Sequence, residues 1–411
     1  MPAQPFSALP LAGFPKLTRR GLLQTAGAFT AWAMVPRFAS AAPARDPRYL
    51  SIVLRGAADG LAVVEPSFDP AYAGLRGPLA LGASGNEAGL PLGNGFQLNP
   101  RLPVLHGLYA EGHALLFHAI ASPYRDRSHF DGQDVIESGQ PGPRLAAAGG
   151  WLNRALSALP GHGEAGGGIA IGSTVPLIMR GKAPTKTWTP SQGDPAPEDA
   201  RRRLLSFYRS ASPLLANSFA QGLELDDFAA RAMAEADPRE RGGFNQGMRM
   251  IGTLLADPNG PRIGSIDLNG WDTHTEERPT GSSLGKTLAR LDEGLGTLRQ
   301  GLGKAWDQTV VSVITEFGRT VRVNGSRGTD HGTATVAILV GGAVKGGRVI
   351  ADWPGLGQGA LYADRDLKPT ADLRAMLKGV LREHLGLEGS VLARSVFPDS
   401  EAVKPMDGLI A

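Results

Sequence analysis

The sequence predicts an α/β fold with a mainly parallel sheet and helices on both of its faces. Two observations carry this prediction: short apolar segments typical of buried strands recur along the 411 residues, and segments with helical periodicity separate them. Apolar residues make up 42% of the chain, enough for a sizeable core, which excludes a mostly disordered protein. No internal repeat is evident, so residues 42–411 are expected to form a single domain.

The first 41 residues predict an export signal. Arg19 and Arg20 in the segment LTRRGLLQ (17–24) form a twin-arginine motif, an apolar run follows over residues 25–35, and Ala39-Ser40-Ala41 matches a cleavage pattern. The run is about half the roughly 20 residues that a membrane span needs. We therefore expect a signal peptide cleaved after Ala41, export by the twin-arginine machinery, and a periplasmic protein without a transmembrane span. The alternative is a basic amphipathic helix of the mature fold.

The net charge of the chain belongs to this segment. The whole sequence has 42 basic and 39 acidic residues, a formal charge of +3. Residues 1–41 contain four basic residues and no acidic one, which leaves 38 basic against 39 acidic residues, a charge of −1. The basic isoelectric point is therefore no argument for nucleic acid as a partner.

The first part of the mature chain predicts two buried strands. Residues 49–54 form the first, and it runs into a glycine-bounded loop that carries Asp59. Residues 66–98 are rich in Gly, Pro and Asn and are expected to form a surface loop. Asn99-Pro100 marks the start of a helix to about residue 111. Residues 113–121 form the second predicted strand, and a helix begins near Ser128.

The second part continues the alternation. Residues 152–159 are predicted helical, 168–171 a strand, and 197–255 a mostly helical, cap-like insertion. Residues 262–268 form another buried strand. Leucines spaced by four and three along residues 284–302 predict a helix with one face on the core. Residues 309–315 and 335–340 are further strands, and Thr370 is expected to cap a last helix ending near residue 385.

Polar side chains follow the predicted strands where a parallel sheet binds its ligands, beyond the carboxyl ends. The candidate residues are Asp59, Ser128, His129, Asp272, His274, Glu316, Arg319, Asp330 and His331. The chain has no cysteine, which excludes disulfides, thiolate metal sites and cysteine nucleophiles. Oxygen and imidazole ligands without sulfur suit Zn²⁺, Mn²⁺, Mg²⁺ or Ca²⁺. One or two such ions could hold a phosphate or sulfate ester and activate its attacker.

Each candidate also has a structural interpretation. The alternatives are a turn at Asp59, a helix cap at Ser128, core packing for His129, an Asx turn for Asp272 with His274, an ion pair between Arg319 and Glu316, and a polar hairpin loop for Asp330 with His331. At Ser128 the two interpretations are compatible, because a serine at a helix N-terminus also faces the end of the helix dipole that favours an anion.

Several motifs together resemble the bacterial DUF1501 family. They are the twin-arginine leader, LRGAADGL (54–61), RSHFDGQDVIESG (127–139), GWDTHT (270–275), TEFGRT (315–320), NGSRGTDHG (324–332) and the ending from Leu361-Tyr362 to Phe397-Pro398. The resemblance covers nearly the whole mature chain. It implies a place in the alkaline phosphatase-like superfamily of phosphatases, sulfatases and phosphoglycerate mutases. It further implies a three-layer α/β/α sandwich, a two-metal site, and a Ser or Thr nucleophile at a helix N-terminus after the second strand.

The resemblance also suggests roles for individual residues. Asp59 matches the superfamily's first metal ligand, Ser128 lies where the nucleophile would be, and Asp272 with His274 falls where ligands to the other metal are supplied. The pair Asp330-His331 is similar to the superfamily's Asp-His pair, which normally follows its strand at once. Here Glu316 holds that place, so His331 could instead stand for a later, separate histidine. A sulfatase pattern C/S-x-P-x-R is disfavoured, because residues 122–125 have the wrong spacing.

Two functions are compatible with these patterns. The first is an exported metal-dependent hydrolase of phosphate or sulfate esters, in which Ser128 attacks, Asp59 and His331 hold metal, and Arg319 steadies the anion. Its substrate would be a small-molecule or glycan ester. The second is a non-catalytic envelope protein whose incomplete metal site binds an anionic glycan or a partner. The incomplete ligand set favours the second, and the convergence of polar groups favours the first.

Overall fold

The computed structural model describes residues 45–82, 85–143, 149–160, 167–190, 197–234, 243–278 and 280–411. The predicted signal peptide with its cleavage after Ala41 lies outside these residues. Within the described residues, we find no helix long and apolar enough to cross a membrane.

A large sheet organises the chain and is mainly parallel, as predicted. Its strands are β1 (Arg48–Arg55), β5 (Ala114–Ala121), β6 (Gly168–Ile171), β7 (Thr185–Trp188), β8 (Ile263–Asn269), β9 (Thr309–Thr315), β10 (Thr335–Val340), β11 (Arg348–Ile350) and β12 (Ala371–Asp372). The order is β11-β5-β10-β9-β1-β8-β6-β7, with β12 also paired to β5. Among these described strands, β10 runs antiparallel to both neighbours and the other pairs are parallel.

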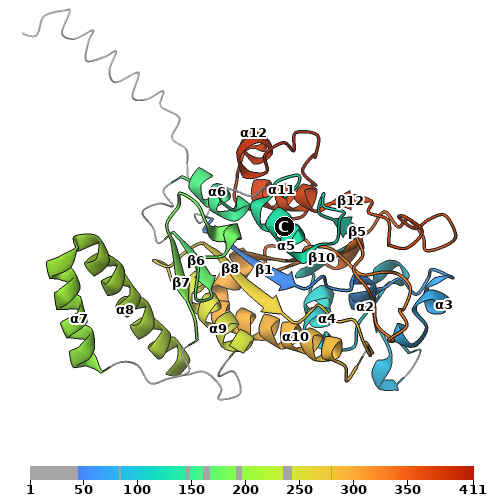
Figure 1. Ribbon diagram of the computed structural model, residues 1–411, viewed down its shortest axis with the longest axis horizontal. Coiled ribbons are helices and arrows are strands. Elements are labelled where there is room, and N and C mark those ends of the chain that lie inside the picture. The colour runs from blue at the N-terminus through green and yellow to red at the C-terminus, as the bar shows by residue number, and fades with distance from the viewer. Residues whose placement is uncertain are drawn as a thin grey trace, which may run out of the picture. The chain divides into compact units, whose positions relative to one another are not determined.

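Helices cover both faces of this sheet, because alternate residues of the strands are apolar on both sides (Figure 1). Leu50, Ile52 and Leu54 of β1 pack in the cluster that contains the leucine stripe of α10 (Ser283–Leu302). The same layer holds α4 (Pro103–Ala110) and α9 (Gly243–Ala256). Tyr49 and Val53 belong to the opposite cluster, with α5 (His129–Ser138), α6 (Trp151–Ala158) and α11 (Leu373–Glu383). The fold class predicted from sequence is thus confirmed.

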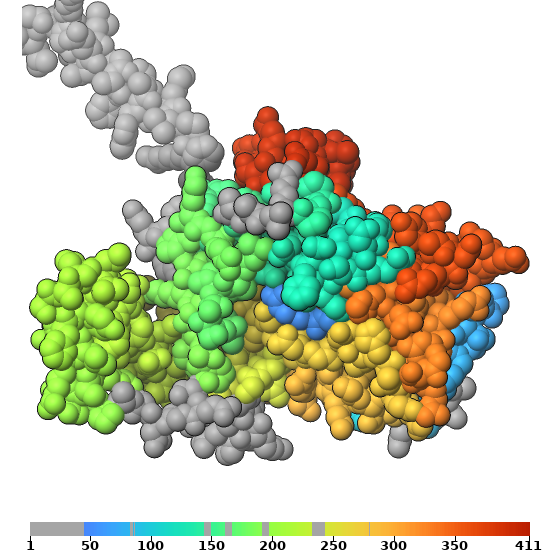
Figure 2. Space-filling model, in the orientation of Figure 1, coloured from blue at the N-terminus to red at the C-terminus, as the bar shows by residue number. Residues whose placement is uncertain are grey.

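The region 197–255 is helical where the structure describes it. α7 (Glu198–Ala211) and α8 (Pro213–Ala234) pack against each other and lie beside β7 at the edge of the sheet (Figure 1). In the space-filling view they form the yellow-green part at the left of the surface (Figure 2). α9 differs from them, because it packs on α10 and β8 as part of a helical layer. In the described part of this region, α7 contacts mainly α8, whereas α8 also contacts α9 and places Ala229 in the core cluster of that layer.

Three local expectations need correction. The helix predicted to start at Asn99-Pro100 begins at Pro103, because Asn99 forms a turn in which its side-chain oxygen accepts the Arg101 N–H. The region 66–98 is more than a surface loop, since it contributes to a small antiparallel sheet of β2 (Val64–Glu65), β4 (Gln97–Leu98) and β3 (Leu90–Pro91). Close by lie the short helices α2 (Gly60–Val63) and α3 (Tyr72–Arg76). The last helix is capped by Asp372 instead of Thr370, because the Asp372 carboxylate accepts the Arg374 N–H. A final short helix, α12, spans Gly389–Val391.

The register of the central strands brings three loops to one edge of the sheet. Arg55 at the end of β1 pairs with Asn269 at the end of β8, and Leu54 pairs with Thr315 at the end of β9. Gly56 allows the chains after β1 and β8 to touch: a Cβ added there would lie 2.4 Å from the Asp272 backbone nitrogen, and its φ of +117° suits glycine. The segments carrying Asp272 and Glu316 therefore meet here.

Candidate metal centre at the carboxyl edge of the sheet

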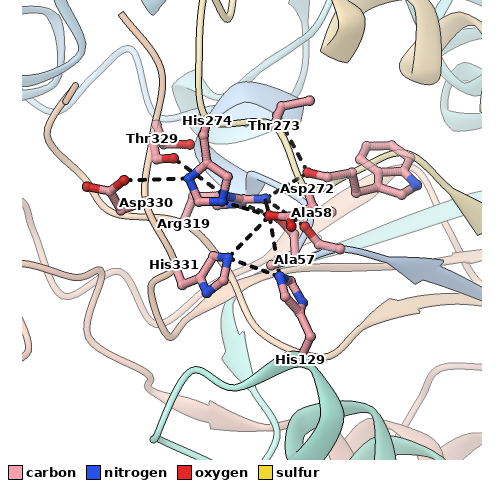
Figure 3. A network of polar contacts seen from close by, with 12 residues as sticks. Ala57, Ala58, His129, Asp272, Thr273, His274, Arg319, Thr329, Asp330 and His331 are labelled. Carbon is pink, nitrogen blue, oxygen red and sulfur yellow. Dashed lines mark hydrogen bonds and ion pairs between the residues drawn. The ribbon is translucent and has the colours of Figure 1, made fainter. Parts of the chain in front are cut away.

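Three side chains from distant segments converge at this edge. His129 is the first residue of α5, Asp272 follows β8, and His331 lies in the loop between β9 and β10 (Figure 3). His129 Nε2 lies 3.0 Å from His331 Nε2 and 3.3 Å from Asp272 Oδ1, and His331 Nε2 lies 3.2 Å from Asp272 Oδ1. Within the described ranges, these residues form the group of His and acidic side chains whose ligand atoms are close enough to share one metal ion.

The triangle of atoms has the size of one face of a tetrahedral metal site. Zn–N and Zn–O bonds of about 2.0–2.1 Å imply distances of about 3.3–3.4 Å between ligand atoms in a regular tetrahedron. The observed separations of 3.0, 3.2 and 3.3 Å are close to this value. Two imidazoles and one carboxylate also form a ligand set that Zn²⁺ commonly takes.

The outer nitrogens of both histidines are held by acceptors. His331 Nδ1 lies 3.0 Å from the Arg127 carbonyl oxygen, and His129 Nδ1 lies 2.8 Å from Glu316 Oε1. A carbonyl and a carboxylate can only accept, so each Nδ1 carries the proton. In the neutral tautomers both Nε2 lone pairs then point at each other across 3.0 Å, beside a carboxylate. Such a contact requires a cation or a shared proton between the rings.

Electrostatics favour a proton on His129 over one on His331. The hydrogen bond to Glu316 raises the pKa of His129 above its usual value. Burial lowers the pKa of His331. Burial also opposes ionisation of Asp272, but hydrogen bonds with Arg319 and His331 outweigh it and hold the pKa of Asp272 well below its usual range. The centre is thus an anionic oxygen between two imidazoles.

Glu316, a predicted ligand, lies behind His129 and outside the triangle. Its side chain is completely buried, and Oε1 accepts from His129, from the Gly56 N–H at 2.9 Å and from Gln133 Nε2 at 3.2 Å. The Thr315 hydroxyl donates to Oε2. Burial raises the pKa of Glu316, but these hydrogen bonds, led by His129, leave it lowered. The geometry suits a carboxylate that orients a ligand, a common arrangement behind metal-bound histidines.

His274 and Asp330 lie beside the triangle. His274 Nε2 is 2.9 Å from Asp272 Oδ1, and its Nδ1 is 3.5 Å from Asp330 Oδ1. All three side chains are about half exposed. The structure therefore brings His274 to the same carboxylate oxygen that His129 and His331 approach.

Arg319 turns toward the protein. Its fully buried guanidinium donates to the carbonyl oxygens of Gly56, Ala57 and Trp271 at 2.8–2.9 Å and to Asp272 Oδ1 at 2.8 Å. The described contacts of Arg319 do not include the predicted ion pair with Glu316, and the predicted clamping of an anion stays a prediction. The structure shows instead an ion pair that holds Asp272.

Asp59 is also placed away from the triangle. Its buried carboxylate caps α2, with Oδ1 accepting from Leu61 N at 3.1 Å and Ala62 N at 3.3 Å. Its other oxygen forms an ion pair with the fully buried Arg76. These local hydrogen bonds to the following backbone are those expected of the alternative interpretation, in which Asp59 forms a turn.

Ser128 occupies the N-cap position of α5, between two segments of the site. The carbonyl of Arg127 holds His331, and the next residue is His129. In the described structure, the Ser128 side chain makes no capping hydrogen bond to the helix. Arg127 has a φ of +62°, a conformation that is uncommon for residues other than glycine. The Ser128 hydroxyl is therefore not needed by the helix.

Sequence reasoning missed two residues of the network. Gln133 lies four residues after His129, so both are on one face of α5, and this spacing could have revealed it. Arg76 comes from the 66–98 region, where no periodicity pointed to a buried cation.

Comparisons with known proteins come from a family model and from solved structures. The family model described as "Protein of unknown function (DUF1501)" matches residues 117–396. No curated protein sequence matches the chain.

Solved structures similar to this one include a protein in the alkaline phosphatase superfamily and two other bacterial proteins. The periplasmic C-terminal domain of EcEptC from Escherichia coli, in complex with Zn, is 10% identical over 72% of this chain and 73% of its own, with a TM-score of 0.37. An alkaline phosphatase superfamily protein from Vibrio parahaemolyticus is 13% identical over 88% and 71%, with a TM-score of 0.36. The phosphonate monoester hydrolase of Agrobacterium radiobacter is 10% identical over 74% and 70%, with a TM-score of 0.31.

Proposed function

We propose that this chain, which belongs to the DUF1501 family, is a metal-dependent hydrolase of phosphate or sulfate esters. The observation that carries the proposal is the triangle of His129 Nε2, His331 Nε2 and Asp272 Oδ1, with the protons of both histidines held on the outer nitrogens. Two imidazole nitrogens and one carboxylate oxygen within 3.0–3.3 Å of one another form a candidate binding site for a divalent cation.

His129, His331 and Asp272 would hold the metal, with Zn²⁺ the best match and Mn²⁺ next. The two imidazoles favour these ions over Mg²⁺ and Ca²⁺, which prefer oxygen ligands. Glu316 and the Arg127 carbonyl would orient the rings, while Arg319 and His274 would hold Asp272. A bound divalent metal supplies Lewis-acid polarisation of the ester and lowers the pKa of an attacking hydroxyl.

Ser128 is the proposed nucleophile. Its oxygen would form a bond to the phosphorus or sulfur atom as the bond to the leaving oxygen breaks, with the hydroxyl proton passing to solvent and water protonating the departing alcohol. A water molecule would then displace the serine oxygen, release the anion and restore the hydroxyl. The N-terminus of α5 favours the negative charge of the ester through its helix dipole. Two observations support this role. Ser128 lies between Arg127, whose carbonyl contacts His331, and His129, and its hydroxyl makes no capping hydrogen bond to α5.

The location of the protein is a separate part of the proposal. The twin-arginine motif and the A-x-A pattern support export to the periplasm by the twin-arginine route. We expect replacement of Arg19 and Arg20 by lysine to leave the full-length precursor in the cytoplasm. Cell fractionation with an epitope at the C-terminus would measure this, and unchanged periplasmic delivery would contradict it.

The enzymatic proposal is tested by metal content and ester hydrolysis together. Purified protein loaded with Zn²⁺ or Mn²⁺ should hydrolyse a panel of aryl phosphates, phosphodiesters or sulfates. Ser128→Ala should lose at least 100-fold in kcat while still binding metal, and His331→Ala should lose both properties. Full activity in Ser128→Ala would remove the serine as nucleophile. Blank assays from metal-loaded protein would favour the envelope-binding alternative.

A further inference from the structure

We infer that two buried guanidinium groups, Arg76 and Arg319, take the place of a second metal, so that the centre binds a single divalent ion. This inference rests on the proposed function and departs from the two-metal site that the family resemblance implies. A second ion would need the carboxylates of Asp59 and Asp272, and both are already paired with these arginines.

Asp59 is the first of these carboxylates, and its oxygens are already occupied. One accepts two backbone N–H groups at the start of α2, and the other is paired with Arg76. The Arg76 side chain is 0% exposed and that of Asp59 is 2% exposed. Arg76 also donates to the Thr320 carbonyl, beside Arg319. A metal ion could reach Asp59 only if this ion pair separated inside the core, which is costly for both charges.

Asp272 is the second carboxylate, and Arg319 lies on its protein side. The guanidinium fills the space between the ends of β1 and β8, where it contacts the carbonyl oxygens of Gly56, Ala57 and Trp271. These are oxygens that a hard cation could otherwise use. Arg319 donates to Oδ1 of Asp272, the same oxygen that faces His129 and His331, so a second ion at this oxygen would have to displace the guanidinium.

The two arginines also neutralise the surrounding charge. Asp59, Asp272 and the buried Glu277 contribute up to three negative charges, and Glu277 is held by the Thr329 N–H and hydroxyl. A divalent ion placed among them would meet two fixed cations at short range, and like charges in a buried site repel strongly. The chain thus supplies within its own fold the positive charge that a second ion would bring.

Native mass spectrometry measures the stoichiometry directly. Protein stripped with chelator and reloaded with excess Zn²⁺, or in parallel Mn²⁺, should carry one ion per chain. Two specifically bound ions would overturn the inference and leave the hydrolase proposal standing. No bound ion would remove the metal centre itself, and with it the proposed function.

Variants then locate the ion by chelator competition, which requires no activity. The double variant Asp59→Asn/Arg76→Met removes both charges of the buried pair while Asn keeps the helix cap, and it should bind Zn²⁺ within about threefold of wild type. Asp272→Asn should weaken binding at least tenfold. A tenfold loss in the double variant, with a wild-type circular dichroism spectrum, would show Asp59 to be a ligand. If this double variant does not fold, Asp59→Asn/Arg76→Gln, which also removes both charges and keeps a polar group at position 76, provides the same comparison.

Discussion

At the level of single residues, the acceptors behind the two histidines determine what the centre can bind. Glu316 and the Arg127 carbonyl each hold a proton on Nδ1, which leaves both Nε2 atoms as donors of electron pairs. A histidine with a free choice of tautomer would relieve the 3.0 Å contact by turning an N–H toward its neighbour. In the proposed metal centre, the groups that fix the two tautomers would therefore not themselves touch the cation.

We expect Glu316→Gln to weaken metal binding by about 10–100-fold, because a neutral amide oxygen is a poorer acceptor for His129 Nδ1–H. The fold should persist, since the amide oxygen can still accept from Gly56. Chelator competition gives the affinity. Asp134→Asn is the matched control, since it removes an exposed carboxylate from α5, the helix that carries His129. Equal affinities in the two variants would show that Glu316 does not orient His129.

Glu277 should make stability depend on pH. Burial, followed by the charge of Asp59, raises the pKa of Glu277 from 4.5 to about 7. The folded state therefore holds this proton more tightly than the unfolded state. The resulting stabilisation is complete below pH 4.5 and is lost as the pH rises through 7, a change on the order of 3 kcal/mol.

Denaturant unfolding at several pH values between 4.5 and 8 tests this expectation. Glu277→Gln should flatten the fall in unfolding free energy, because the amide cannot ionise. The neighbouring Glu276→Gln should keep the wild-type profile, since Glu276 is half exposed and pairs with Arg327. Parallel profiles for wild type and Glu277→Gln would contradict the assignment.

At the level of elements, the site depends on how closely the loops after β1 and β8 approach each other. Gly56 makes that approach possible, and its N–H also donates to Glu316. The start of α5 then presents His129 to the same place, stacked on Phe317 with ring centroids 5.1 Å apart. Strand ends and one helix terminus therefore fix the geometry before any ligand is present.

Gly56→Ala and Gly107→Ala should change stability in opposite directions. At Gly56 the methyl group meets the Asp272 backbone at a positive φ, so we expect a loss of about 1–3 kcal/mol and weaker metal binding. Gly107 lies within α4 with nothing within 4 Å of an added Cβ, so alanine should stabilise by about 0.5–1 kcal/mol. Chemical denaturation measures both, and a neutral Gly56→Ala would show that the loops can separate without cost.

At the level of the whole molecule, metal binding should stabilise the fold, because the ion would join α5, the end of β8 and the loop before β10. Metal at 100 times its dissociation constant adds about 2.7 kcal/mol. We expect chelation to lower the melting temperature by several degrees and added Zn²⁺ to restore it. His331→Ala should show no such response. If neither chelator nor added metal changes the melting temperature of the wild-type protein, the result would argue against the proposed metal centre.

Much of this architecture could be predicted from sequence. The same physical reasons explain which contacts of the candidate site could not be predicted. The buried strands were evident because segments such as 49–54 and 309–315 are short, mostly apolar and rich in β-branched residues. The carboxyl ends of β8 and β9 then bring Asp272 and Glu316 to one edge of the sheet. His129 and His331 were candidates by position. The partners of Asp59 and Arg319 could not be foreseen, since Arg76 comes from a segment without periodicity and backbone carbonyls leave no trace in a sequence. The order of side chains around His129, with Glu316 behind it, likewise depends on tertiary packing.

The wide spacing of the three ligand residues has a consequence for the life of the chain. Positions 129, 272 and 331 come together only after β8, β9 and the loop before β10 have joined β1 in the sheet. A nascent, truncated or misfolded chain presents isolated histidines and no three-ligand site. The ion could therefore bind only after folding is complete. In a cell that supplies the metal in only one compartment, the protein would first acquire its ion in that compartment.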